Sequence, residues 1–445
     1  MHETPAAHVL RARALLRLGR PADAASEIDA VLEPTGSHFE DARTLSFEQL
    51  GELHTLRATA RVRCHRFSDA DDSFLSARVY TYSSGNAALE AELAYYEAHY
   101  AQAAGARIEF EAWARAVLAV RPEPVSVPSR AAYFVPLEHS RARAYDLLGF
   151  IAAEAHNFRE QARQLRSSLE EFDRTTVRDA WFEAKQLAHL SYYVRDFGDE
   201  DVAEYVLQRY GCTEWTAELA AQQQEVLRSL GWSTAMRGDF LSAFRFLRDA
   251  ADIAPTIPYK ISAILDRAYL SGELQLGVVA REEVDYAERL AARVCWNDVH
   301  AEAEIVALLQ LSAALAPIDA PRARLALERY RTLKKTLPTS ALAHGDPRVR
   351  AEELAAQAAI LRAEGFGERA KLAFVDSFET WRSLGCAWQA ALVARELTKL
   401  GAGAAFASCT AAEARRHPAS WLAARSAPGQ PPAGARSYLR RAGNS

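Results

Sequence analysis

Three pairs of residues in the sequence have the types that metal sites use, but none has the spacing that such sites need. Cys64 and His65 are adjacent, and no second Cys/His pair lies at ligand spacing, as a zinc site would require. Glu and His stand two residues apart in YYEAH (95–99) and in AAEAH (152–156), which places them about 200° apart around a helix. Di-iron bundles use a Glu-x-x-His spacing instead. We therefore expect no metal ion and no other cofactor.

Motifs for enzymatic chemistry are also missing from the sequence. It contains no GxxxxGK[ST] phosphate loop, no GxGxxG after a strand, no HExxH and no GxSxG. The five cysteines lie at least 23 residues apart, so they form no CxxC clip, and their odd number disfavours a disulfide framework. The sequence predicts a protein that is not an enzyme and that resides in the reducing cytoplasm.

Composition and charge argue against several further classes. The chain has 445 residues, of which 49% are hydrophobic, and a net charge of −5 at pH 7, so no basic field favours nucleic acid or acidic membranes. The N-terminal stretch carries Arg11, Arg13 and Arg17 where a signal peptide would be apolar, and no run of 18 apolar residues occurs. We expect a soluble protein with no membrane partner, for which direct nucleic-acid binding is unfavourable.

The elements expected along the chain are helices. Apolar residues recur three and four apart, as in ALVARELTKL and AELAYYEAHYAQA, which is the period of an amphipathic helix. No window alternates Val, Ile or Thr with polar residues as a strand would. These patterns predict an all-α fold.

Residues 227–255, LRSLGWSTAMRGDFLSAFRFLRDAADIAP, allow two interpretations. The first is a helix-turn-helix whose recognition helix begins near Ser233, but Gly238 and Asp239 would end that helix after about one turn, too short for a major groove. The second is one unit of a helical repeat, with Gly231 on the first helix and Ala243, Leu247 and Ala250 on the second. Small residues let two helices approach while the large residue fills the groove between them. This interpretation explains more of the segment.

Similar small–large–small stripes recur through the chain. They begin at residues 24, 70, 112, 161, 203, 243, 287, 323 and 370, with spacings between 36 and 49 residues. Such recurrence indicates a tandem array in which each helix pair packs against the next.

The pattern Leu227, Gly231, Ala243, Leu247, Ala250 and Pro255 resembles the tetratricopeptide repeat (TPR) family, with Thr234 where that family usually has Tyr. The resemblance covers about residues 5–400. The period near 43 is longer than the family's roughly 34 and overlaps the roughly 40–47 of HEAT and armadillo repeats. The spacing is also similar to the helical-repeat sensor regions of bacterial transcription regulators. The resemblance implies a right-handed α-solenoid of about nine antiparallel helix pairs with a C-terminal helical cap.

The resemblance also implies where a ligand would bind. In TPR arrays the first helix of each pair lines the concave groove, and its exposed residues bind peptides. Counting back from the stripes places eight residues there: Arg143, Asp146, Phe150, Lys185, Tyr192, Arg195, Arg228 and Trp232. Arg, Lys and aromatic side chains suit a partner with acidic groups. An N-terminal segment with Glu52, Thr55, Thr59 and Glu97 would make that end of the groove acidic. The alternative is that the aromatic residues simply pack between repeats.

Clusters of Pro with Gly, Ser or Asp at 33–38, 121–130, 254–258, 316–321 and 337–348 predict loops. We expect N-terminal repeats at 1–120, central and C-terminal repeats at 131–400, capping helices at 401–426 and a disordered basic tail at 427–445.

These features predict a non-catalytic scaffold or regulator that binds a protein or peptide in its groove. The alternative is a sensor in which a signalling peptide or small molecule controls a transcription or signalling partner. A scaffold should present an open trough, and a sensor a closed pocket near residues 143–232. An enzyme would need acid/base residues brought together from distant repeats.

Overall fold

The computed structural model describes residues 5–33, 45–121, 135–175, 179–294, 301–336 and 345–426. All regular elements within these ranges are helices, so the all-α prediction is confirmed. The chain divides into two compact units, Met1–Gln186 and Leu187–Ser445, which are called unit 1 and unit 2 below. The right-handed sense of the array and the number of helix pairs stay predictions.

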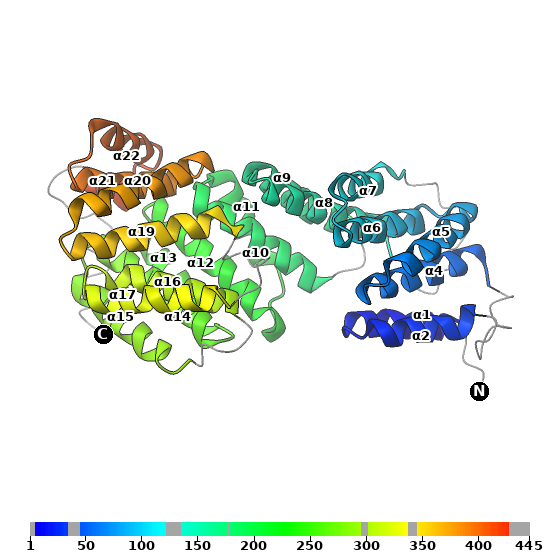
Figure 1. The fold of residues 1–445 in the computed structure, drawn as a ribbon. Coiled ribbons are helices and arrows are strands. Elements are labelled where there is room, and N and C mark those ends of the chain that lie inside the picture. The colour runs from blue at the N-terminus through cyan, green and yellow to red at the C-terminus, as the bar shows by residue number, and fades with distance from the viewer. Residues whose placement is uncertain are drawn as a thin grey trace. The chain divides into compact units, whose positions relative to one another are not determined.

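Unit 1 is a stack of antiparallel helix pairs, α1 with α2, α4 with α5, α6 with α7, and α8 with α9 (Figure 1). A further helix, α10, begins in unit 1 and ends in unit 2. The helices are α1 (Pro5–Arg17), α2 (Pro21–Leu32), α4 (Phe47–Arg63), α5 (Phe67–Ser84), α6 (Ala87–Ala103), α7 (Arg107–Ala119), α8 (Leu137–Glu154), α9 (Phe158–Phe172) and α10 (Ala180–Phe197).

Local sequence fixes where these helices begin and turn. Ser46 and Gln49 form a capping box at the start of α4, and the Asn86 side chain accepts hydrogen bonds from two backbone N–H groups of α6. These groups have no partner inside a helix, so the caps define its first turn. Between α5 and α6, Gly85 has a φ of 64°, which glycine adopts at no steric cost. The chain can therefore reverse direction there within a few residues.

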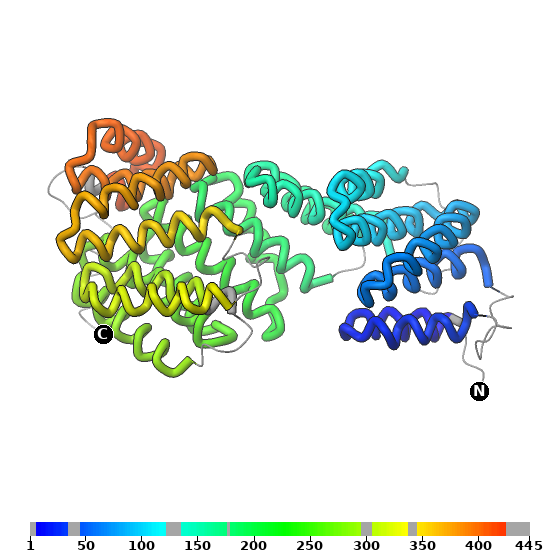
Figure 2. The backbone as a smooth tube through the Cα atoms, viewed as in Figure 1, coloured from blue at the N-terminus to red at the C-terminus, as the bar shows by residue number. Residues whose placement is uncertain are grey.

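Unit 2 continues the same back-and-forth path, which Figure 2 traces. After the second half of α10 its elements are α11 (Glu200–Cys212), a short 3₁₀ turn (Ala217–Leu219), α12 (Ala220–Met236), α13 (Phe240–Asp252), α14 (Ile257–Glu273), α15 (Gly277–Ala291), α16 (Ala301–Leu315), α17 (Ala320–Lys334), α19 (Pro347–Ala363), α20 (Gly367–Ser383), α21 (Ala387–Lys399), α22 (Ala404–Arg416) and α23 (Trp421–Ser426).

The segment 227–255 is a helix pair, as the repeat interpretation predicts. Ser233 lies inside α12 and does not begin a helix, so no recognition helix starts there. Gly238, with a φ of 82°, turns the chain into α13. Leu247 is 1% exposed and packs against Gly231. The stripe residues are therefore the contact between the two helices.

Unit 2 joins its early helices to its last ones. A core cluster combines residues of α12, α13 and α14 with residues of α21, α22 and α23. At its centre the ring of Trp421 lies 5.1 Å from that of Trp388 and 5.7 Å from that of Trp232, between ring centroids. Within the range 401–426 lie α22 and α23, and Trp421 of α23 packs onto Trp388 of α21 and Trp232 of α12. That these helices cap the array stays a prediction.

The predicted loop at 121–130 and the predicted tail at 427–445 lie almost wholly outside the described residues. The two compact units meet between Gln186 and Leu187, within the continuous helix α10, whereas the sequence predicts a break before residue 131. None of the described helices is long and apolar enough to cross a membrane.

Candidate ligand-binding pocket

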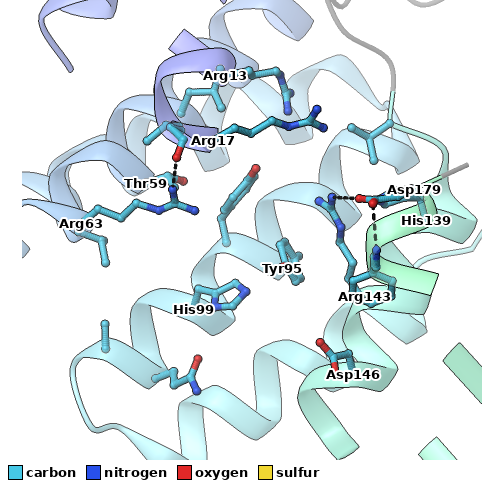
Figure 3. A pocket seen from close by; sticks show the side chains of 18 of the residues that line it. Arg13, Arg17, Thr59, Arg63, Tyr95, His99, His139, Arg143, Asp146 and Asp179 are labelled. Atoms are coloured by element: carbon cyan, nitrogen blue, oxygen red, sulfur yellow. Dashed lines mark hydrogen bonds and ion pairs between the residues drawn. The ribbon is translucent and has the colours of Figure 1, made fainter. Parts of the chain in front are cut away.

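Unit 1 contains a pocket of about 860 Å³ on the face formed by the first helices of its pairs. Its lining residues come from α1, α4, α6, α8 and the first turns of α10, together with residues of the loops beside them (Figure 3). The second helices contribute little, because they pack behind the first ones. This is the face on which the TPR resemblance places ligands.

Cationic side chains outnumber acidic ones in this lining. Five are cationic, Arg13, Arg17, Arg63, Arg143 and Lys185, against the two carboxylates of Asp146 and Asp179. Both carboxylates are held by cations: Lys185 Nζ lies 3.0 Å from Asp146 Oδ2, and Arg143 Nη2 lies 3.7 Å from Asp179 Oδ2. The excess of positive charge therefore rests on the three remaining arginines.

Arg13 is neutralised from behind the pocket. Its guanidinium donates to Glu92 Oε1 at 2.7 Å and to Glu52 Oε1 at 2.9 Å. The side chain of Glu52 is fully buried and that of Glu92 is 4% exposed. This network ties α1 to α4 and α6. The prediction that Glu52 makes this end of the groove acidic is wrong, because Arg13 compensates it.

Arg17 and Arg63 have no carboxylate partner among the described residues. Arg63 donates to the backbone carbonyl of Leu16 at 2.6 Å, which fixes it beside α1 while leaving its charge uncompensated. Arg17 is exposed on α1. In Figure 3 the side chains of Arg17, Arg63 and Arg143 extend from three helices toward the same open space. An anion there would meet guanidinium groups from several directions.

Aromatic rings form another part of the wall. The ring of Tyr95 meets His99 edge-on, with centroids 4.7 Å apart, and Arg143 lies 5.5 Å from the Tyr95 centroid. Trp181, at the start of α10, lines the pocket and is 55% exposed. Burial lowers the pKa of His99 to about 4, so this ring is neutral at pH 7. Such a wall offers apolar contact area beside the cations.

His139 of α8 is a buried polar group in the lining. It is 5% exposed, and neither ring nitrogen has a hydrogen-bond partner among the described residues. Burial first, and then the positive charge of Arg143, lowers the pKa of His139 to about 4. A neutral imidazole offers one donor and one acceptor. Because an unsatisfied buried polar group costs about 1–3 kcal/mol, a ligand that pairs with His139 would gain affinity.

Three of the eight predicted groove residues lie in this pocket: Arg143, Asp146 and Lys185. Phe150 belongs to α8 as well but does not line it. Its side chain is 44% exposed, with its ring centroid 6.5 Å from that of Phe110.

The other four predicted residues belong to unit 2, where they contact protein groups. Arg228 is 4% exposed and donates to Asp266 at 2.6 Å. Trp232 packs against Tyr269 and Trp421. Arg195 lies over the ring of Tyr192 and pairs with Asp196. The structure does not bring these four residues to the pocket of unit 1, and their role in binding stays a prediction.

Sequence reasoning missed several lining residues, namely Arg17, Arg63, Tyr95, His99, His139 and Trp181. Some signals for them were present. Arg13 and Arg17 are four apart on one helix, and Tyr95 and His99 are the first and last residues of YYEAH, whose Glu and His were first considered for metal binding. Among the described residues no group of three or more His, Cys, Asp or Glu side chains could hold a metal ion.

Comparisons with known proteins give structural likeness only. No protein-family model matches the chain, and no curated protein matches it. Among solved structures, it is similar to a Rap protein crystallised with Competence and Sporulation Factor, at 13% identity and a TM-score of 0.39, over 81% of this chain and 99% of that one. It is also similar to the apo form of the quorum sensor NprR from B. thuringiensis, at 13% identity and a TM-score of 0.37, over 88% and 86% of the two chains.

Proposed function

We infer that the chain is a non-catalytic regulator whose unit 1 senses a ligand of the size of a short peptide. The observation that supports this most strongly is the pocket itself. The first helices of four pairs and the first turns of α10 supply its lining, and two of its arginines have no carboxylate partner among the described residues. A volume of about 860 Å³ falls within the range of roughly 300–1,000 Å³ of pockets that enclose small ligands. A pocket of this volume suits a small ligand or a short peptide better than a large protein partner, which favours a sensor.

Helix α10 offers a route from ligand binding to unit 2. Trp181 and Lys185 in its first turns line the pocket, whereas Val194 and Asp196 near its end are buried within unit 2. Ligand contacts with Trp181 and Lys185 that favour one position of α10 would therefore also change how Val194 and Asp196 pack within unit 2. A ligand shifts such an equilibrium by its difference in affinity for the two positions.

A protein-binding scaffold is the second candidate, and the outer face of α5 favours it. Leu75, Val79 and Tyr82 lie on one side of this helix and are 60%, 58% and 54% exposed. Adjacent exposed apolar side chains of this kind occur at protein contacts. The two candidates are compatible, since a sensor needs a partner to control. A reducing compartment such as the cytoplasm is part of the proposal, supported by the free thiols of Cys64, Cys212, Cys386 and Cys409.

A variant that fills the pocket tests the proposal. Ala14 of α1 lines the pocket and is exposed, while Ala22 of α2 is exposed and does not line it. We expect Ala14→Trp to block the pocket without disturbing the core, and Ala22→Trp to serve as the matched control. The full chain is incubated with a pool of N-acetylated pentapeptides, separated by rapid gel filtration, and the retained peptides are identified by mass spectrometry.

Wild type and Ala22→Trp should retain the same peptides, and Ala14→Trp should lose them. Hydrogen exchange of α10 residues 187–197 should slow when the retained peptides are added to wild type. If Ala14→Trp retains the same set, binding lies outside the pocket and the proposal fails. It fails as well if wild type retains none.

A further inference from the structure

The charged groups of the pocket indicate the chemistry of its ligand, given the proposed function. These groups differ in whether the fold provides a carboxylate for each cation. Lys185, Arg143 and Arg13 each have a carboxylate at 3.7 Å or less. Arg63 donates to the carbonyl of Leu16, and neither Arg63 nor Arg17 has a carboxylate partner among the described residues. Among the described residues, the two pocket cations without a carboxylate partner are therefore the last residues of α1 and of α4.

The position of Arg63 is set by the fold. Its bond to the Leu16 carbonyl holds the guanidinium against α1, one residue before Arg17. A guanidinium has five N–H donors, so one such bond leaves the others available. Arg63 can thus bind an anion with no large rearrangement of its side chain, and prior placement reduces the entropy lost on binding.

The α8 side of the pocket has the opposite character. Asp146 and Asp179 are already paired with cations, and in the described part of the chain neither ring nitrogen of His139 has a hydrogen-bond partner. Neutral polar groups, such as peptide amides, suit this end. Between the two ends, Tyr95 and Trp181 offer aromatic surface.

We propose that the pocket binds a short peptide whose carboxylate is held by Arg17 and Arg63, with its neutral amide groups toward His139. A carboxylate has two oxygens, which can accept from two guanidinium groups at once, and charge-assisted hydrogen bonds of this kind are the strong ones. The carboxylate is either the C-terminus of the peptide or an Asp or Glu side chain.

Three pools of N-acetylated pentapeptides distinguish these sources. The first has free C-termini and no Asp or Glu, the second has C-terminal amides and one Asp or Glu, and the third has C-terminal amides and no acidic residue. Each pool is tested by gel filtration and mass spectrometry with full-length wild type, Arg17→Gln, Arg63→Gln and the double variant. Arg115→Gln is the matched control, since Arg115 is an exposed arginine on α7 that does not line the pocket.

We expect wild type and Arg115→Gln to retain one of the two carboxylate pools about tenfold or more over the neutral pool. Each single variant should reduce this preference, and the double variant should abolish it while still retaining neutral peptides weakly. Arg17→Gln is the safer variant for folding, because Arg17 is exposed on α1, and circular dichroism checks each protein.

The outcomes separate the two levels of the proposal. If wild type retains the neutral pool as strongly as the carboxylate pools, the inference is overturned while pocket binding stands. A preference for carboxylate that persists in the folded double variant also overturns it. If wild type retains none of the three pools, both the inference and the proposed function fail.

Discussion

Gly231 lies where α12 and α13 pack, and adding one methyl group there tests the repeat packing. A Cβ atom at this position would lie 2.7 Å from Leu247 Cγ, 2.8 Å from Leu247 Cδ2 and 3.4 Å from the carbonyl oxygen of Ala243. Leu247 is 1% exposed, so its branch point cannot move into solvent. Gly231→Ala must therefore push the two helices apart or distort the Leu247 side chain.

Two terms of opposite sign determine the size of the effect. Overpacking a core costs about 1–3 kcal/mol, whereas replacing Gly by Ala inside a helix gains about 1 kcal/mol. The two distances below 3.0 Å to Leu247 place the cost for Gly231→Ala at the upper end of that range, so we expect a net loss of about 2 kcal/mol. At Gly149, the equivalent position of an earlier repeat, the new Cβ would lie 3.6 Å from Gln164 Cβ, which is an ordinary contact. Gly149→Ala should therefore be neutral or stabilise the protein.

Urea unfolding with hydrogen exchange followed by mass spectrometry measures both effects in the full chain. Exchange should quicken in peptides of α12 and α13 for Gly231→Ala and should not change there for Gly149→Ala. Gly272→Ala is a control inside α14, where the nearest atom to the new Cβ, that of Ala280, would be 3.9 Å away. The packing argument is refuted if Gly231→Ala is as stable as wild type, or if all three variants lose stability equally.

Two further predictions concern buried charge in unit 1. Arg13→Met leaves Glu52 and Glu92 buried without their cation, so unfolding free energy at pH 7 should fall by about 3–5 kcal/mol. Urea melts at pH 7 in which Arg13→Met is as stable as wild type would contradict it. Burial, opposed by the charge of Arg78, raises the pKa of Glu97 from 4.5 to about 7. The folded state thus binds this proton more tightly than the unfolded state, so the free energy of unfolding should fall as pH rises from about 4.5 to 7. In urea melts, Glu97→Gln should show a weaker dependence on pH over this range. Equal pH dependence in both proteins would argue against this reasoning.

The sequence was sufficient for the helix pairs because their packing is local. Ala243, Leu247 and Ala250 are at most 1% exposed, as are Ala70 and Ala77 of an earlier stripe. Each stripe contacts a helix only a few residues away in the chain, so its spacing carries the information. Small residues at fixed offsets predict such contacts wherever they occur.

Long-range contacts carry no such local signal. Trp421 packs on Trp388 and on Trp232, which precedes it by 189 residues, and Arg348 pairs with Asp196 across 152 residues. No offset in the sequence predicts either contact. The same reason explains why the division of the compact units within α10 was not predicted, since it follows from which helices pack together in space.

The site shows the same limit. Counting back from the stripes selected three residues that line the pocket of unit 1, Arg143, Asp146 and Lys185. The same rule selected Arg228 and Trp232, but in unit 2 these side chains contact other protein groups. Arg228 donates to Asp266, and Trp232 packs against the ring of Trp421. Whether a first-helix residue meets solvent or another part of the protein depends on how the array curves, which local spacing does not specify.

Arginine residues thus have different surroundings in the two units. In unit 2, Arg228 meets the carboxylates of Asp266 and Glu225, and it is 4% exposed. A buried guanidinium must be compensated within the fold, because an unpaired one would cost several kcal/mol. In unit 1, Arg17 and Arg63 border a water-accessible pocket, where solvent hydrates their guanidinium groups. They therefore need no carboxylate partner within the fold and can pair with an external anion. The residue type alone therefore does not distinguish a structural arginine from one that is available to a ligand, whereas the presence of neighbouring carboxylates does. For this reason Arg17 and Arg63 are the arginines to change first, before Arg195 or Arg228.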